Sequence, residues 1–558
     1  MKIFSTLIEF VDYCAQEYGD LTYMREKVGD QWTETSYTDT RQQGREIAAG
    51  LMSMGLNKGE SVALLSEGRN LWVTSELGIL YAGGVNVPLS IKLEESNDLT
   101  FRIHHSEARF VIVSAEQLHK IRHIRAEIPL VEKIIIIGKD IPTEADEVLI
   151  SDVIDSGKKF LQTRESELTK RSLSIQPTDY ASISYTSGTT AAPKGTLLTH
   201  NNYTTNIVHA RSVIGVNKGE VMLIVLPLDH CFAHVAGMYT MMSYGGSIAT
   251  VPVGKNSLAT LRNVPAAIKE VRPHVMPVVP ALLRSLKSNI EKSIIKSGKT
   301  AELLYRWAMR NTIAYNREYW NRGKGQMWRK PLVKIFDSLI FKRIRDGLGG
   351  RMIWFVGGGA YLDIELQRFF CAIGIPVYQG YGQSEATPII SSNSPNHAVF
   401  GSSGRPVKPM DIKIIDEEGK ELKNGEKGEI IIRGGNVMAG YWKNEQSTKE
   451  TIVDGWLHTG DMGYIENYNN EDYLFVMGRF KSLLISSDGE KYSPEGFEDA
   501  LTESSPYIDQ CLLYNNQNLY TIALLVPNKD NLKTYVKQQK KHSDEQKVML
   551  DIDRKSVV

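Results

Sequence analysis

The sequence has no excess of charge of either sign. Its 558 residues include 65 Lys and Arg against 65 Asp and Glu, so the formal net charge is zero. A protein that coats DNA or RNA needs a large basic excess to bind phosphates without sequence preference. The charge balance therefore argues against a nucleic acid partner, although it leaves room for a local basic patch.

Cysteines are few and long apolar runs are absent. The four cysteines, Cys14, Cys231, Cys371 and Cys511, have no CxxC spacing, which argues against a disulfide framework or a zinc site and favours a reducing compartment. The N-terminus is poor in apolar residues and already contains Glu9, which is unlike a signal peptide. No stretch approaches the roughly 20 apolar residues of a membrane-spanning helix. We therefore expect a cytoplasmic protein.

The composition is that of a globular protein of several domains. Hydrophobic residues make up 42% and charged residues 23%, which excludes long disordered, collagen-like and coiled-coil structures. Short β-branched runs at 61–66, 110–114 and 133–138 alternate with helical stretches such as 38–54. This alternation predicts an α/β fold with doubly wound sheets of buried parallel strands.

The sequence changes character in the segment 400–480. Gly-rich turns there separate brief strands such as 429–433, a pattern that predicts a small antiparallel β-barrel or sheet. A last segment follows with strands of its own, such as 520–526. We expect a large N-terminal domain over 1–478 and a small α+β C-terminal domain over 479–558.

The strongest local signal is the run of hydroxyl-bearing residues and glycine between Tyr185 and Gly195. Hydroxyls and backbone N–H groups can donate to phosphate oxygens, and Lys194 adds a positive charge. The run is not a Walker loop, because Pro193 stands where that pattern requires glycine. The run predicts a loop that holds a polyphosphate, whereas a Ser/Thr-rich stretch alone is more often a simple turn.

Five motifs in this order resemble those of the adenylate-forming superfamily, which includes acyl-CoA synthetases, luciferases and the adenylation domains of peptide synthetases. Besides the loop, the motifs are 357–360, 380–385, 455–461 and 478–481. The resemblance covers nearly the whole chain. It implies an N-terminal domain of two doubly wound sheets plus a small β-barrel, followed by a C-terminal domain on a hinge.

The resemblance also assigns residues to ATP and to Mg²⁺. Glu385 would hold Mg²⁺, which prefers oxygen ligands and usually takes one or two carboxylates plus phosphate oxygens. Tyr381 would stack on adenine, Asp461 would accept from both ribose hydroxyls, and Lys194 would reach the phosphates. The further ATP-binding residues implied are Thr186, Ser187, Gly188, Thr189, Thr190, Gly358, Gly359, Ala360, Gly380, Gly382, Ser384 and Arg479.

Each of these residues also has an ordinary structural interpretation. Tyr381 fits a core aromatic, Asp461 fits a turn residue after Gly460, and Glu385 fits an acid at a helix N-terminus. Taken singly, these interpretations would be preferred. The ordered set of motifs favours the nucleotide interpretation.

The acyl and CoA sites are implied by resemblance as well. His230 would lie near the reacting oxygens and Phe232 on the wall of the acyl tunnel, while the alternative for His230 is a side chain that satisfies a backbone carbonyl. Lys481 would form the hinge. Gly489 would line the CoA tunnel, where a glycine lets the backbone approach a thin ligand closely.

A long basic and aromatic insertion, 315–345, is similar to that of long-chain fatty acyl-CoA synthetases. Such a segment can lie on an anionic membrane surface, and we expect peripheral contact with the inner face of a membrane. The alternative is a solvated helix pair whose apolar stripe packs on the core.

The chain departs from the family pattern at several positions. Ala191 stands where glycine is usual, and Ser384 stands where threonine is usual but keeps the hydroxyl. The family's C-terminal lysine in a Gly-Lys pattern has no counterpart after Lys481, and the last residues, 553–558, match a translated sequencing adapter. We therefore expect an incomplete C-terminal domain and slow adenylation.

The expected reaction has two steps. A long-chain fatty acid attacks the α-phosphate of MgATP to give acyl-AMP and pyrophosphate, and CoA then takes the acyl group and releases AMP. The resemblance leaves a homodimer open. The alternatives are an acyl-AMP ligase that loads a carrier protein, and a catalytically impaired homologue that still binds ATP.

Overall fold

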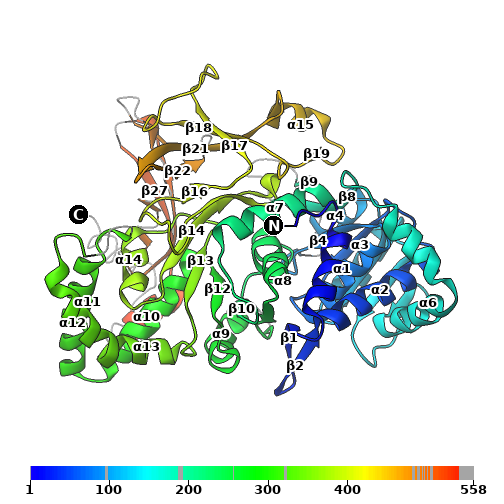
Figure 1. Cartoon of the computed structure of the whole chain (residues 1–558), viewed down its shortest axis with the longest axis horizontal. Coiled ribbons are helices and arrows are strands. Elements are labelled where there is room, and N and C mark those ends of the chain that lie inside the picture. Colours follow the sequence, from blue (N-terminus) through cyan, green and yellow to red (C-terminus); the bar gives the residue numbers. More distant parts are fainter. Residues whose placement is uncertain are drawn as a thin grey trace. The chain divides into compact units, whose positions relative to one another are not determined.

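The computed structural model describes most of the chain (Figure 1). The chain divides into two compact units. The described residues are 2–94, 98–186, 193–254, 257–319, 323–479, 484–486, 491–492, 494, 497–498, 501–502, 505, 507–518 and 520–538. The first unit comprises Met1–Thr459 and Tyr464–Phe475, and the second comprises Gly460–Gly463 and Val476–Val558.

The first unit contains an eight-stranded sheet of order β19-β9-β8-β4-β3-β5-β6-β7. The strands from β8 to β7 along this order pair in parallel, whereas β9 pairs antiparallel with both β8 and β19. Its strands are β3 (Ser61–Leu65), β4 (Val85–Leu89), β5 (Ala108–Ser114), β6 (Lys133–Ile137), β7 (Glu147–Leu149), β8 (Tyr180–Thr186), β9 (Lys194–Thr199) and β19 (Gly440–Tyr441). Three of them coincide with the runs predicted at 61–66, 110–114 and 133–138. Every residue of β3 is buried, as expected for a strand covered on both faces.

Helices pack against this sheet and against one another. They are α1 (Leu7–Tyr18), α2 (Tyr37–Ser53), α3 (Asn70–Tyr81), α4 (Asp98–His105), α5 (Leu118–His123) and α6 (Ile150–Leu173). Figure 1 shows α2 and α6 side by side. Glycines allow the two backbones to touch. A Cβ at Gly157 would lie only 1.8 Å from the Glu46 carbonyl oxygen, and a Cβ at Gly50 would lie only 2.2 Å from the Val153 carbonyl oxygen.

The first unit also contains a nine-stranded mixed sheet, whose strand order is β16-β15-β14-β13-β12-β10-β11-β1-β2. Its strands are β1 (Thr22–Val28), β2 (Gln31–Ser36), β10 (Val221–Ile224), β11 (Ser247–Thr250), β12 (Val275–Val278), β13 (Trp354–Gly357), β14 (Val377–Gly382), β15 (Ile389–Ser392) and β16 (Arg405–Pro406). The strands from β11 to β14 are parallel. The two sheets confirm the predicted α/β fold.

The helical segments that follow these strands include two π-helical stretches, which form only where the regular ladder is interrupted. They are α7 (His200–Val213), η2 (Phe232–Tyr239, π), α8 (Thr240–Tyr244), α9 (Ser257–Val271), α10 (Pro280–Lys296), α11 (Lys299–Tyr315), η4 (Met327–Arg329), α12 (Lys330–Phe336), η5 (Asp337–Phe341, π), α13 (Lys342–Gly347), α14 (Ile364–Ala372) and η6 (Ser384–Ala386). In the part of the chain that the structure describes, no helix is long and apolar enough to cross a membrane.

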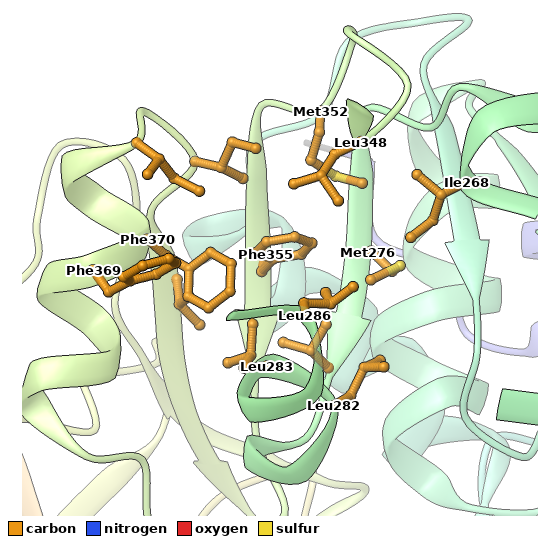
Figure 2. Close-up of a cluster of buried hydrophobic side chains, with 14 of the residues drawn as sticks. Ile268, Met276, Leu282, Leu283, Leu286, Leu348, Met352, Phe355, Phe369 and Phe370 are labelled. Atoms are coloured by element: carbon orange, nitrogen blue, oxygen red, sulfur yellow. The ribbon is translucent and has the colours of Figure 1, made fainter. Parts of the chain in front are cut away.

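One hydrophobic core holds β12 and β13 against α10, α13 and α14. Figure 2 shows Phe355 of β13 beside Phe370 of α14, and their ring centroids are 5.4 Å apart in an edge-to-face arrangement. Met276, Leu283 and Leu286 complete the fully buried centre. This core fixes the ends of β13 and β14, from which the turns of the candidate site project.

The segment predicted to be a small antiparallel barrel or sheet forms antiparallel strands. They are β17 (Asp411–Ile415), β18 (Gly428–Arg433), β20 (Ile452–Val453), β21 (Trp456–Tyr468) and β22 (Glu471–Arg479), with α15 (Glu445–Thr451) before β20. The second unit adds two small sheets and a helix, made of β23 (Leu484–Ser486), β24 (Lys491–Tyr492), β25 (Ile508–Tyr514), β26 (Asn516–Asn518), β27 (Ile522–Pro527) and α17 (Lys529–Gln538).

Candidate active site

The predicted phosphate loop connects two neighbouring antiparallel strands. Thr186 ends β8, Lys194 begins β9, and the two residues are cross-strand partners. Both therefore stand at the base of the loop. The predicted phosphate-binding residues between them, Ser187, Gly188, Thr189 and Thr190, lie outside the described residues.

A second cation lies at this base besides Lys194. Arg102 of α4 is buried, and its guanidinium carbon is 5.7 Å from the centroid of the Tyr185 ring. The Tyr185 hydroxyl in turn shares a hydrogen bond of 2.9 Å with His105 Nδ1. Burial lowers the pKa of Arg102, but a guanidinium keeps its charge at neutral pH. Positive charge at this position suits an anionic ligand.

Lys194, Tyr441 and Glu385 form a row of direct contacts. Lys194 Nζ lies 4.9 Å from the centroid of the Tyr441 ring, and the Tyr441 hydroxyl donates a 2.9 Å hydrogen bond to Glu385 Oε1. β19 holds Tyr441 there by pairing it with Thr196 of β9. Burial and the charge of Glu385 raise the pKa of Tyr441, so its phenol stays a neutral donor. The row joins the phosphate loop to the predicted metal carboxylate.

The Glu385 carboxylate fits a Mg²⁺ ligand. Its Oε1 accepts from Tyr441, while Oε2 accepts from no described residue. Mg²⁺ is usually held by one or two carboxylates together with phosphate oxygens and water, and a single carboxylate such as that of Glu385 fits this pattern. The turn η6 has only three residues, so a helix dipole is a poor reason for an acid at this position.

The turn that carries Glu385 is held by buried amides. Asn206 of α7 and Asn436 donate their side-chain N–H groups to the Ala386 carbonyl at 3.3 Å and 3.0 Å. Thr387, in a left-handed conformation with φ 62°, donates its hydroxyl to the Asn436 carbonyl at 2.7 Å. A Cβ at Gly382 would lie 2.1 Å from the Pro388 carbonyl oxygen, so only glycine fits there. These contacts fix the backbone on both sides of Glu385.

Cys231 links the phosphate-loop strand to the same turn. Its Sγ donates to Ser384 Oγ at 3.5 Å and lies 3.5 Å from Ser184 Oγ of β8. Burial raises the pKa of the thiol, which therefore remains protonated. Ser384, which resemblance assigns to the α-phosphate, is thus tied through one side chain to the strand that leads into the loop.

The predicted adenine turn follows β13. Phe232 packs on Gly358, where a Cβ would lie 3.3 Å from two carbons of the phenyl ring. Gly359 has φ 82°, which favours glycine, and the Ala360 carbonyl accepts a 3.1 Å hydrogen bond from Gln379 Nε2. The residue predicted for the acyl tunnel therefore contacts the turn predicted for adenine.

Tyr381 is half-buried on β14, which is unlike a core aromatic. It pairs with Ser391 of β15, and the preceding Gly380 packs so that a Cβ would lie 3.3 Å from the Ser391 carbonyl oxygen. The ring thus lies at the exposed end of a strand whose first three residues are buried. A partly exposed ring can offer a face to a planar ligand.

His230 uses one ring nitrogen on the backbone, though not as the sequence suggested. Its Nδ1 accepts the Phe232 N–H at 3.3 Å instead of donating to a carbonyl. Burial, opposed in part by Asp229, lowers the pKa of His230. Neutral imidazole that accepts at Nδ1 carries its proton on Nε2, which can therefore act as a donor.

The residues predicted for ribose lie on β21 and β22 in the second unit. Arg479 Nε is 4.0 Å from Asp461 Oδ1, and the Asp461 side chain is the more buried of the two. Lys481 and Gly489 lie outside the described residues.

Sequence reasoning missed Tyr441, Arg102, Cys231 and the two asparagines. Tyr441 is 56 residues from Glu385, and no local pattern marks it. Arg102 sits in an unremarkable helix. The one available signal was the position of Cys231 directly after His230, within a segment already assigned to the acyl site. Contacts between distant segments created the other roles.

Known proteins resemble this chain over most of its length. The sequence model of the family described as AMP-binding enzyme matches residues 11–442. The long-chain-fatty-acid–CoA ligase FadD15 of Mycobacterium bovis is 29% identical over 499 residues, which cover 88% of this chain and 77% of that protein. The chloroplastic long-chain-fatty-acid–acyl-carrier-protein ligase AEE15 of Arabidopsis thaliana is 27% identical over 561 residues, which cover 92% and 75%.

Solved structures share the fold. The crystal structure of the anthranilate CoA ligase AuaEII in complex with anthranoyl-AMP matches with a TM-score of 0.71 at 20% identity and covers 98% of this chain and 92% of that one. The N-terminal domain of FACL13 from Mycobacterium tuberculosis matches with a TM-score of 0.61 at 21% identity and covers 85% and 100%. At these identities the likeness concerns the fold alone.

The enclosure of Cys231 can be tested with a thiol reagent. Cys14, Cys231 and Cys371 are buried, whereas Cys511 is half-buried. We expect DTNB to label Cys511 first in the native protein, and the other thiols only upon unfolding, because the reagent cannot reach the three buried thiols. Cys511→Ser should remove the fast absorbance change. If Cys231→Ser removes it instead, the contacts of Cys231 with Ser184 and Ser384 do not enclose the thiol.

Proposed function

Because the chain belongs to the AMP-binding enzyme family, whose model matches most of its length, we propose that it activates a long-chain fatty acid with ATP and transfers the acyl group to CoA. The row of contacts from Lys194 through Tyr441 to Glu385 carries this proposal. It brings together a phosphate-loop cation and a carboxylate that fits Mg²⁺, which lie far apart in the sequence.

In the proposed first step a fatty carboxylate attacks the α-phosphate of ATP, and pyrophosphate leaves. Lys194 and Thr186 would hold the β- and γ-phosphates, and Arg102 would add positive charge behind them. Ser384 would donate its hydroxyl to the α-phosphate. Mg²⁺ bound by Glu385 would neutralise phosphate charge. The work of the protein is then positioning and charge stabilisation.

The acid would enter beside His230 and Phe232. Neutral His230 can donate its Nε2 proton to a carboxylate oxygen, and Phe232 provides an apolar wall that ends at the adenine turn. This arrangement orients the carboxylate toward the nucleotide while the alkyl chain contacts apolar side chains. The preference for a long chain is supported by relatives that carry that substrate in their names.

The second step is proposed to use the second unit. Asp461 and Arg479 would hold the ribose, Lys481 would be the hinge between domains 1–478 and 479–558, and Gly489 would line the CoA path. A homodimer remains part of the proposal. CoA would supply the thiolate that attacks the acyl carbon and releases AMP.

A carrier protein is the alternative acceptor. The relative AEE15 is named as an acyl-carrier-protein ligase and is nearly as similar as the CoA ligases. An assay of thioester formation on free CoA distinguishes the two acceptors. The reaction contains ATP and oleate, and the loss of the CoA thiol is measured. Thiol loss with CoA supports the proposal, whereas transfer only to a holo acyl carrier protein favours the alternative.

Replacement of the proposed metal carboxylate tests the first step. We expect Glu385→Gln to lower the fatty-acid-dependent exchange of pyrophosphate into ATP by at least about a hundredfold, because the metal loses its charged ligand. The amide still accepts from Tyr441, so the free energy of unfolding should change by less than about 0.5 kcal/mol.

The exposed helix α15 offers a matched control. Glu445→Gln removes a carboxylate that is 92% exposed, and exchange should stay at the wild-type rate. Wild-type exchange in Glu385→Gln would show that this carboxylate does not hold the metal.

The lowered pKa of His230 predicts a pH dependence. Neutral imidazole prevails above its depressed pKa and is lost only when the pH falls through that value, which lies below 6.5. An unperturbed imidazole titrates at about pH 6.5. The rate of pyrophosphate exchange should therefore stay constant from about pH 8 down to about pH 6.5 and fall in more acid buffer. His230→Gln should abolish this acidic limb. A limb centred above pH 6.5 that the substitution removes would contradict the assigned direction.

A further inference from the structure

Helix α11 has two apolar stripes. Tyr305, Ala308 and Met309 are buried in the core of the nine-stranded sheet. On the opposite face of the helix, Leu303 and Trp307 lie one helical turn apart, and their side chains are 68% and 51% exposed. The buried stripe accounts for the attachment of the helix, and the second apolar stripe is left facing solvent.

The helical run of α12, η5 and α13 repeats this arrangement. Phe336 and Phe341 are buried, whereas Ile335 and Leu339, also one turn apart, are 51% and 56% exposed. Trp328, in the turn η4 just before α12, is 63% exposed. A solvated helix pair would carry polar side chains at these positions.

The exposed stripes adjoin. Trp307 and Phe336 meet edge to face with ring centroids 4.8 Å apart, and Figure 1 shows α11 and α12 next to each other. η4 contacts both helices, and the Arg329 guanidinium lies 4.2 Å from the Trp328 ring centroid. The α11–α12 surface is defined by the side chains of Leu303, Trp307, Trp328, Ile335 and Leu339.

Positive charge surrounds this surface in a chain that is neutral as a whole. The segment 299–345 contains twelve Lys and Arg against three Asp and Glu. The exposed cations next to the apolar side chains are Arg306, Arg310, Lys330, Lys334, Lys342 and Arg343. The surface is thus complementary to an anionic, partly apolar partner.

We propose that the α11–α12 surface docks on an anionic lipid bilayer. The tryptophan and aliphatic side chains would enter the headgroup boundary, where amphipathic aromatic rings are favoured, while the Lys and Arg side chains contact lipid phosphates. The purpose of this docking rests on the proposed function, because a long-chain fatty acid partitions into such a bilayer and the enzyme would meet its substrate there. The geometry of the surface does not depend on that function.

The two other occupants fit the surface less well. A second copy of this chain would bring two basic surfaces face to face, and like charges across an interface repel. A nucleic acid would engage the cations but would leave Leu303, Ile335 and Leu339 without a role. A bilayer uses both the charge and the apolar side chains.

Sedimentation of the full chain with vesicles tests the proposal. We expect binding to phosphatidylcholine vesicles that contain phosphatidylglycerol, weaker binding at high salt, and little binding to phosphatidylcholine alone. The double variants Lys330→Glu/Lys334→Glu and Leu303→Ser/Trp328→Ser should each lower the partition coefficient by about tenfold or more, through lost charge attraction and lost apolar insertion respectively.

Matched controls come from exposed residues elsewhere in the first unit. Lys423→Glu/Lys427→Glu and Leu173→Ser change side chains of the same kinds outside the surface, and binding should stay at the wild-type level. Pyrophosphate exchange with a water-soluble medium-chain acid, in the absence of vesicles, should be unchanged in all these variants. If the wild type shows no pyrophosphate exchange, the proposed function is contradicted. Vesicle binding would still test the docking proposal by itself.

Four results would overturn the docking proposal. One is equal binding to neutral and anionic vesicles, and a second is an equal loss in the control variants. The third is a concentration-dependent dimer in light scattering that Leu303→Ser/Trp328→Ser abolishes, since the surface would then hold a second copy. Binding that depends on the cations alone, and that short DNA abolishes by competition, would indicate a polyanion site.

Discussion

The hydrogen bond from Tyr441 to Glu385 is the interaction on which the candidate site depends. It joins a two-residue strand at the edge of the eight-stranded sheet to the turn between β14 and β15 of the nine-stranded sheet. Because β19 pairs with β9, the same tyrosine also contacts Lys194 at the start of that strand. The phenol of Tyr441 therefore links the two sheets, and it positions Lys194 and the proposed metal carboxylate of Glu385 relative to each other.

Buried polar groups around this bond favour one arrangement of the turn. Asn206 and Asn436 satisfy the Ala386 carbonyl from two directions, and Cys231 occupies the space between Ser184 and Ser384. A buried carbonyl without a donor would cost roughly 1–3 kcal/mol, so any movement of the turn that breaks these bonds is opposed. Such a site can present Glu385 to a ligand without reorganising, which is how preorganised groups stabilise developing charge.

Much of the fold was predictable from the sequence, whereas only part of the site was. Strands such as 61–66 are continuous apolar runs, and the structure forms them because both faces are covered. The motif residues Lys194, Ser384 and Glu385 carry their own local pattern. Tyr441 and Arg102 do not, because their importance arises from strand pairing and helix packing between distant segments. The 315–345 insertion was recognisable as basic and aromatic, but only the structure separates its buried stripe from its exposed one.

We propose that Glu385, oriented by Tyr441, binds the metal that accompanies ATP. The most direct test is the Mg²⁺ dependence of pyrophosphate exchange at saturating ATP and fatty acid, compared between the wild type and Tyr441→Phe. Phenylalanine keeps the ring beside Lys194 and removes only the donor to Glu385. The account predicts that half-maximal exchange requires a several-fold higher Mg²⁺ concentration in the variant, because a charge-assisted hydrogen bond that orients the carboxylate is lost. An unchanged Mg²⁺ requirement would contradict it.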